Sequence, residues 1–165
     1  MNNELRKRVK KNFWIFIIFI GAGILAIFYF IRYPDFFLNK KKVGSIVVFP
    51  RQNMEINIEV ADTSYQWSKG LMFRENMAQN SGMLFIFPDE AIRSFWMKNT
   101  LIPLDIIYIS KNKVIVDVKE NFLPCPPNQF ICPTYASKGA AMYVLEVNAG
   151  VVAKNSIHIG DKVEF

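Results

Sequence analysis

The sequence contains few of the residues and motifs on which catalytic sites are commonly built. Its 165 residues include one histidine, His158, and two cysteines. It has no GxSxG, HExxH or glycine-rich phosphate-binding motif. A Ser-His-Asp mechanism needs a histidine, but His158 lies in SIHIGDKV without a recognisable partner, which favours a surface or edge-strand position. These absences favour a protein that is not an enzyme, although they leave the question open.

Excess positive charge is absent from most of the chain. The formal net charge is +6, but residues 44–165 carry 11 basic and 12 acidic side chains. The excess of basic residues therefore lies in the first 43 residues. Binding to nucleic acid needs a positive surface on the folded domain. We expect no nucleic-acid partner, and we assign the basic residues to contacts with anionic lipid.

One long apolar run is present. Residues 13–31, FWIFIIFIGAGILAIFYFI, carry no charge and would extend about 28 Å as a helix, close to the ~30 Å hydrocarbon core of a bilayer. Residues 1–12 are basic, which predicts a cytoplasmic amino terminus. A cleaved signal peptide is the alternative, but bulky residues end the run where small ones are expected. The sequence therefore predicts a single-pass anchor in the cell membrane at 13–31, a linker at 32–42 and an extracytoplasmic domain at 43–165.

The two cysteines, Cys125 and Cys132, lie in the proline-rich segment LPCPPNQFICPTY. An extracytoplasmic location permits a disulfide, and a bridge here would close a loop of eight residues. In the chain-entropy model such a loop is worth roughly 2.5 kcal/mol. Two unbridged thiols are the alternative, and a metal site lacks further ligands nearby. We expect a structural disulfide, with no metal and no cofactor.

Apolar alternation and turn residues predict seven or eight short strands after the linker. Residues 54–61, MEINIEVA, alternate like a half-buried strand, and Thr63 with Gln66 has the spacing of a capping box that opens a helix through Leu71. Further strands are predicted at 43–49, 83–87, 94–99, 104–109, 114–118 and 141–147, a second helix at 149–155, and turns at 80–82, 88–89 and 111–113. No helix of 10–15 residues separates the strands. The predicted fold class is therefore mainly β, at the margin of α+β: a compact antiparallel sandwich or barrel with one or two short helices.

Two carboxylates interrupt apolar strands and mark a candidate site. Asp105 lies in LDIIYI and Glu146 in YVLEV, where a buried acid needs a partner or the open end of a strand. One hypothesis is that these acids converge on one polar patch or pocket with other polar side chains nearby, and the full set is Arg74, Lys98, Asn99, Thr100, Asp105 and Glu146. The other interpretation, a set of edge polar groups and internal ion pairs that fix strand register, is favoured because structural ion-pair networks are common.

Several motifs together resemble one family. GLM-x-R at 70–74, GMLF-x-F at 82–87, FWMKNT at 95–100 followed by PLD, and VLE-x-x-AG at 144–150 with a closing Gly-Asp occur in the order and spacing of the family called domain of unknown function 192. The resemblance covers about residues 55–165. It implies a compact, mostly β domain, often exported or anchored by an amino-terminal helix in prokaryotes. The family has no assigned chemistry, so the resemblance supplies motif positions without roles.

Three functions follow as hypotheses. The first is a membrane-anchored, extracytoplasmic β domain that binds a small polar molecule, a glycan or another envelope protein. The second is an enzyme that hydrolyses an envelope polymer, with Asp105 and Glu146 as its acid and base. The third is a structural subunit of a membrane complex, held by contacts of residues 13–31 within the bilayer. A concave pocket that holds the polar residues favours the first two.

Overall fold

The computed structural model describes residues 45–126, 129 and 131–165. The predicted basic tail at 1–12, the anchor at 13–31 and the linker at 32–42 lie outside the described residues. Among the residues that are described, none of the helices has both the length and the apolar character that a bilayer crossing requires.

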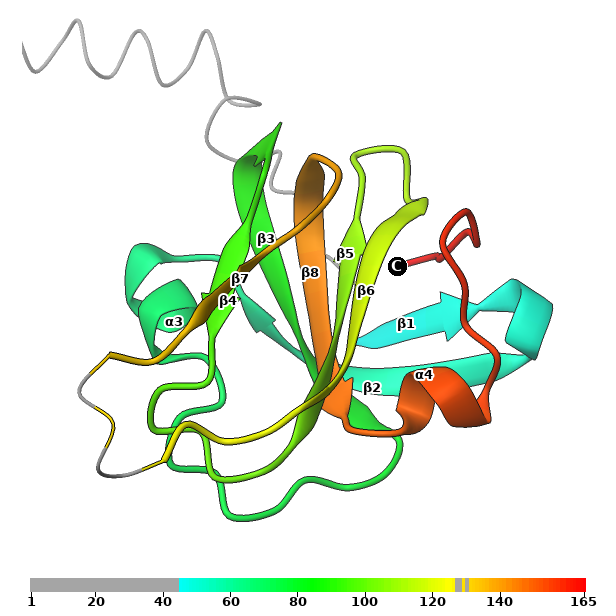
Figure 1. The fold of residues 1–165 in the computed structure, drawn as a ribbon. Helices are drawn as coiled ribbons and strands as arrows, with labels where there is room; N and C mark the ends of the chain where they lie inside the picture. Colours follow the sequence, from blue (N-terminus) through cyan, green and yellow to red (C-terminus); the bar gives the residue numbers. More distant parts are fainter. Residues whose placement is uncertain (1–44, 127–128, 130) are drawn as a thin grey trace, which may run out of the picture. The chain divides into compact units, whose positions relative to one another are not determined.

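The described chain forms a six-stranded sheet, a two-stranded sheet and two short α-helices (Figure 1). The large sheet has the strand order β1-β2-β3-β8-β5-β6, and β4 pairs with β7 in the small one. The strands are β1 (Ile46–Phe49), β2 (Met54–Ala61), β3 (Ser81–Ala91), β4 (Ser94–Trp96), β5 (Leu104–Ile109), β6 (Ile115–Phe122), β7 (Thr134–Ala136) and β8 (Ala141–Asn148). The helices are α3 (Ser64–Lys69) and α4 (Val151–Lys154), and a 3-10 turn, η1 (Pro50–Gln52), joins β1 to β2.

The prediction of a mainly β fold with two short helices is confirmed, but the antiparallel sandwich or barrel is wrong. The large sheet is mixed, because β2 and β3 pair in parallel while its other pairs are antiparallel. A parallel pair needs a crossover of a dozen or more residues, and residues 62–80 supply it with only the six-residue helix α3. The barrel is not closed, because the carboxy-terminal segment contributes only the isolated bridges Val48↔Glu164 and Val114↔Lys162 between the edge strands.

Strand β3 is longer than its apolar run predicts. It begins at Ser81 and continues through Pro88 to Ala91, so the turns predicted at 80–82 and 88–89 are partly wrong. Its pairing with β8 becomes irregular after Ile86, and such an irregularity tolerates a proline that lacks an N–H group. Gly82 lies within this strand. A Cβ at this position would lie only 2.5 Å from the backbone oxygen of Glu146, so no side chain fits there. The glycine therefore permits close approach of β3 to β8.

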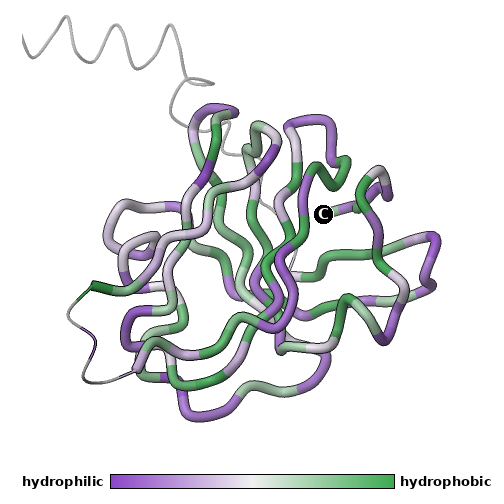
Figure 2. The backbone as a smooth tube through the Cα atoms, viewed as in Figure 1, coloured by the Kyte–Doolittle hydropathy of each residue, from purple (hydrophilic) through white to green (hydrophobic). Residues whose placement is uncertain are grey.

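The central strands of the large sheet are buried on both faces. One core includes Ile107 and Leu145 and is covered by α4, and the second core includes Ile106, Val144 and Phe85 and lies on the other face. All six residues of β5 are buried in consequence. Figure 2 shows the apolar residues along the central strands and the hydrophilic ones mainly in the outer loops. A strand buried on both faces loses the simple alternation of a half-buried strand.

Candidate functional site

The buried carboxylate of Asp105 holds three segments together. Asp105 is fully buried on β5. Its Oδ1 accepts the backbone N–H of Asn121 at 2.8 Å, and its Oδ2 accepts the backbone N–H of Val152 at 2.9 Å. Val152 lies in the first turn of α4, where backbone N–H groups have no partner within the helix. Asp105 therefore ties β5 to the end of β6 and to α4, which is a structural role.

Glu146 and Asp105 do not share a site. In the pairing of β5 with β8, Glu146 lies opposite Ile106 and Asp105 lies opposite Val147. Successive side chains of a strand point to opposite faces. Ile106 belongs to the second core and Val147 to the first, so the two carboxylates lie on opposite faces of the sheet. The acid and base of the hydrolase hypothesis are not assembled by this arrangement.

Glu146 lines a small cavity beside the second core. The cavity has a volume of about 20 Å³, and its walls include Phe85, Phe95 and Thr100. Only 5% of Glu146 is exposed, and burial raises the pKa of its carboxyl group to about 8. No hydrogen bond or ion pair within the described part of the chain reaches this carboxyl group, whose oxygens border the cavity; the one fully enclosed side-chain N or O atom of the described residues without a partner is Oε1 of Gln52. An acid in this position is protonated over much of the neutral pH range.

Gly70 brings the chain close to the Glu146 carboxyl group. It ends α3, whose start is fixed by the predicted capping box of Thr63 and Gln66, and its N–H donates to the Gln66 carbonyl at 2.8 Å. Its φ of +44° lies in the region that favours glycine. A Cβ at Gly70 would lie 3.2 Å from Cζ of Phe85 and 3.9 Å from Oε2 of Glu146. The absence of a side chain at this position thus leaves the cavity open.

The FWMKNT segment closes the other side of the cavity, but it does so as a turn. Strand β4 ends at Trp96, and Asn99 adopts a φ of +54°, so the predicted alternation fails after Trp96. Thr100 is buried at the cavity, whereas Lys98 and Asn99 are exposed. The carbonyl of Asn99 accepts the N–H of Phe73 at 2.8 Å. This bond joins the turn to the segment that follows α3.

Arg74 lines a larger groove next to the cavity. The groove has a volume of about 640 Å³, and it shares Lys69, Gly70 and Met72 with the lining of the cavity. Arg74 makes two hydrogen bonds of 2.6 and 2.8 Å to the carboxylate of Glu59 across this groove. The hydrogen bond from Arg74 holds the pKa of Glu59 below its usual range. The groove therefore presents one bound pair of opposite charges beside the cavity.

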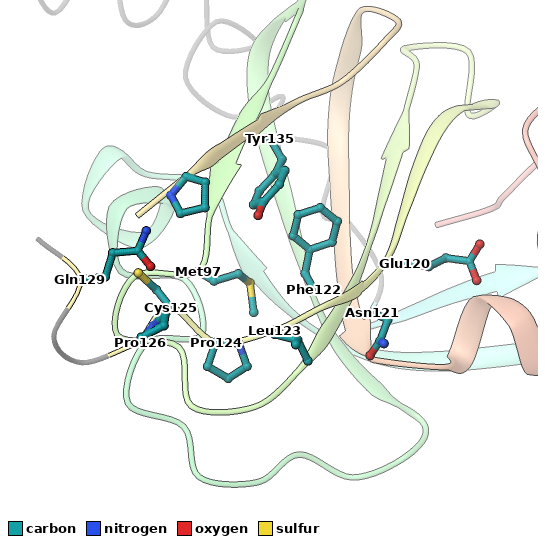
Figure 3. Close-up of a pocket in the computed structure, with 11 residues that line it drawn as sticks. Met97, Glu120, Asn121, Phe122, Leu123, Pro124, Cys125, Pro126, Gln129 and Tyr135 are labelled. Atoms are coloured by element: carbon teal, nitrogen blue, oxygen red, sulfur yellow. The ribbon is translucent and has the colours of Figure 1, made fainter. Parts of the chain in front are cut away.

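A second groove lies under the predicted disulfide loop. The structure joins Cys125 and Cys132 by a disulfide. The groove, of about 520 Å³, is lined by Met97, Phe122 and Tyr135 among others (Figure 3). None of the six predicted site residues lines it. Its walls are largely prolines and apolar side chains, so it offers fewer groups for polar recognition than the Glu146 cavity.

The structure brings together part of the predicted site. Lys98, Thr100 and Glu146 line the cavity, Arg74 lines the adjoining groove, and Asn99 contributes a backbone contact. Sequence reasoning missed two features of the site. One is Glu59, which lies within the alternating strand β2, and the other is the aromatic lining of the cavity. The spacing of the GLM and FWMKNT motifs could have indicated that these two segments meet at one cavity. No group of three His, Cys, Asp or Glu side chains able to hold a metal ion occurs among residues 45–126, 129 and 131–165.

The motifs that line this site are those of a known family. The model of the family DUF192, described as "Uncharacterized ACR", matches residues 46–165. The chain belongs to this family. The resemblance noted in the sequence is thereby confirmed, and it extends nine residues closer to the amino terminus, because β1 is included.

Similar proteins support the same fold. A UPF0127 protein of Thermococcus sibiricus is 30% identical over 113 residues, which are 66% of this chain and 65% of that protein, so the match spans just under two thirds of that relative. A crystal structure of a protein of unknown function from Novosphingobium aromaticivorans is 33% identical, with a TM-score of 0.66 over 73% of this chain and 83% of that one. A Sinorhizobium meliloti protein, described provisionally as a transcription regulator, is 32% identical, with a TM-score of 0.65 over 72% and 89% of the two chains.

Proposed function

We propose that the chain is a membrane-anchored, extracytoplasmic protein whose β domain binds a small polar ligand at Glu146. The site is the small cavity together with the groove of Arg74 and Glu59. The observation that supports this proposal is the carboxyl group of Glu146, a residue only 5% exposed, which borders the cavity and has no hydrogen bond or ion pair within the described residues. A buried polar group without a partner lowers stability. A ligand that supplies the missing partner would offset this loss of stability.

The chemistry of the site suits a polar ligand. A protonated Glu146 donates one hydrogen bond and accepts others. The hydroxyl of Thr100 lies in the same cavity, and its Oγ1 makes only a long contact of 3.5 Å with the Lys98 carbonyl. In the adjoining groove, Arg74 and Glu59 offer donors and acceptors that a ligand can share. The near-balanced charge of residues 44–165 gives no support to nucleic acid as the ligand.

A thermal-shift screen of the full chain in detergent tests the binding function. The probes are sugars, peptidoglycan fragments, amino acids and amines. We expect one class to raise the melting temperature of the wild type, by an amount equivalent to about 2.7 kcal/mol at a hundred times the dissociation constant. The Glu146→Gln variant keeps the shape of the side chain but loses the acid, and we expect its response to that class to be much smaller.

The matched control is Glu55→Gln, because Glu55 is an exposed residue of β2. Its response should equal that of the wild type. An equal shift in Glu146→Gln would place the ligand elsewhere in the protein, for example in the groove of Figure 3. If no class of probe shifts the wild type, the binding function is wrong, and a structural subunit of a membrane complex becomes the better hypothesis.

The location of the domain needs a separate test. The support for the anchor is the uncharged run at 13–31 behind a basic tail, and a disulfide fits an oxidising compartment. Trypsin added to spheroplasts should cleave in the basic linker at 32–42 and release a fragment of the domain into the medium. A domain that resists trypsin until the cells are lysed would contradict the proposed orientation.

A further inference from the structure

The size of the Glu146 cavity limits what can enter it. A cavity needs a free volume of roughly 10–15 Å³ to hold one water molecule. The cavity has about 20 Å³ and therefore has room for one group of about that size. The body of a larger ligand has to remain in the adjoining groove of about 640 Å³, which shares three lining residues with the cavity. A ligand thus inserts one small head group.

The walls of the cavity favour a positive head group. Four aromatic residues contribute to the lining, namely Trp67, Phe85, Phe95 and Trp96. The rings of Phe85 and Phe95 lie 5.0 Å apart, edge to face. Aromatic rings attract cations through their negative faces, and a carboxylate in a desolvated site attracts them more strongly. The combination of several rings with one unpartnered carboxyl group is therefore better suited to a cation than to a neutral group.

The rim of the cavity already provides an example of this contact. The ammonium group of Lys98 lies 5.3 Å from the ring centre of Trp96. Lys98 is exposed, and within the described residues its ammonium group forms no ion pair with Glu146. The inner position next to the carboxyl group is thus left to another cation.

From this geometry we infer that the ligand carries a primary ammonium group, which enters the cavity and pairs with the carboxylate of Glu146. This inference rests on the proposed binding function and names its ligand class. Thr100 supplies a hydroxyl acceptor for a second N–H of the ammonium group. The remainder of the amine lies in the groove beside Arg74 and Glu59.

Charge balance then requires the release of a proton. The free site holds a protonated Glu146, and the ligand brings one positive charge. As the ion pair forms, the carboxyl proton passes to solvent and the site remains neutral. The other ionisable groups near the carboxyl group are Lys69 of α3, Lys98 of the turn and Tyr108 of β5. Burial raises the pKa of Glu146. Neither lysine forms an ion pair with it among the described residues.

The test measures the titration of Glu146 in the presence of an amine. The full chain, labelled with carbon-13 at glutamate and held in detergent, is titrated by NMR with methylammonium chloride as the probe. At ten times its dissociation constant, methylammonium should lower the apparent pKa of Glu146 by about one, because only the ionised form binds it. Methanol, which has the same size without the charge, and potassium chloride at equal ionic strength should leave the pKa unchanged.

A second variant separates the cavity from general charge effects. Gly70→Ala places a methyl group 3.9 Å from Oε2 of Glu146 and narrows the cavity without changing its charge. Circular dichroism first establishes that this variant folds, and methylammonium should then have little effect on its Glu146 pKa. The inference is overturned if methylammonium leaves the wild-type pKa unchanged, or if potassium chloride lowers it equally.

The failure of this inference differs from the failure of the proposed function. If a neutral sugar stabilises the wild type but not Glu146→Gln, and methylammonium leaves the Glu146 pKa unchanged, then the site binds a polar ligand that is not an amine. If no probe in the thermal-shift screen depends on Glu146, the binding function itself is wrong.

Discussion

Asp105 and Glu146 lie on neighbouring strands of one sheet, yet their carboxyl groups occupy opposite faces. Asp105 is opposite Val147 in the β5–β8 pairing, and Glu146 is opposite Ile106. Both oxygens of Asp105 accept backbone N–H groups. The carboxyl group of Glu146 instead lines a cavity, without a partner in the described chain. Two acids with similar sequence surroundings therefore have different environments, one fully hydrogen-bonded to the backbone and the other bordering a cavity.

Replacement of Asp105 by asparagine should destabilise the domain without altering the Glu146 cavity, which is the proposed ligand site. The amide group keeps one acceptor but turns an N–H₂ group towards a backbone N–H donor of Asn121 or Val152. We expect the free energy of unfolding to fall by about 3 kcal/mol, as measured by chemical denaturation. Asp89→Asn is the control, because Asp89 is 66% exposed and its pair with Arg93 contributes less than about 1 kcal/mol. Similar losses in both variants would contradict the structural role of Asp105.

The stability of the domain should fall with rising pH because of Glu146. Burial raises the pKa of Glu146 in the folded chain to about 8, from 4.5 in the unfolded chain. Between these values the folded chain retains a proton that the unfolded chain has lost. The free energy of unfolding therefore decreases as pH rises, by up to about 1.4 kcal/mol per pH unit.

The Glu146→Gln variant isolates this contribution. Its free energy of unfolding, minus that of the wild type, should grow as pH rises from 4.5 to 8, and it should be constant below that range. Denaturant unfolding of both proteins at a series of pH values gives the difference. Other groups, such as Asp161, titrate equally in both proteins and cancel. A difference that does not change with pH would show that Glu146 is ionised in the folded domain.

Gly82 should not tolerate a side chain. A Cβ at this position would lie 2.5 Å from the backbone oxygen of Glu146, and backbone atoms of a central strand have little freedom to move. We expect Gly82→Ala to lower the free energy of unfolding by about 2 kcal/mol or more, and to widen the β3–β8 pairing near the cavity. Ser81→Ala is the control one residue earlier in the same strand. The two variants are compared by thermal unfolding, and equal melting temperatures would contradict this close approach.

The disulfide should contribute to stability through the loop that it closes. The bridge between Cys125 and Cys132 joins residues seven apart in sequence. Replacement of both cysteines by serine should lower the free energy of unfolding by roughly 2.5 kcal/mol, because the unfolded chain gains freedom. A reducing agent should destabilise the wild type and leave the double variant unchanged. An effect of the reducing agent on the double variant would point to a cause other than this bridge.

Local patterns predicted the parts of the fold that depend on neighbouring residues. The strand at 54–61 has the predicted bounds, because one of its faces is more exposed and its alternation is preserved. The helix after Thr63 follows from the capping box, which involves residues three apart. The turn at 111–113 and the helix near 149–155 are local in the same sense. These elements needed no knowledge of the rest of the chain.

Features that depend on distant pairing could not be predicted in this way. The parallel pairing of β2 with β3 depends on how residues 62–80 cross over, which no local motif specifies. Pro88 ends the apolar run in sequence but not the strand, because an irregularity in the pairing with β8 accommodates it. The face on which Glu146 lies is set by the register of β8 against β5, and a shift by one residue would reverse it. The sequence identified the two acids but had no means to separate their roles.

The titration of Glu146 in the ligand-free chain is the most direct test of this account. Its side-chain carbon signal, followed by NMR against pH, reports the protonation of this one group. If the carboxyl group is buried without a partner, the midpoint lies at about 8. A midpoint near 4.5, the ordinary value for a glutamate, would mean that the group is hydrated or paired, and the proposed ligand site would be contradicted.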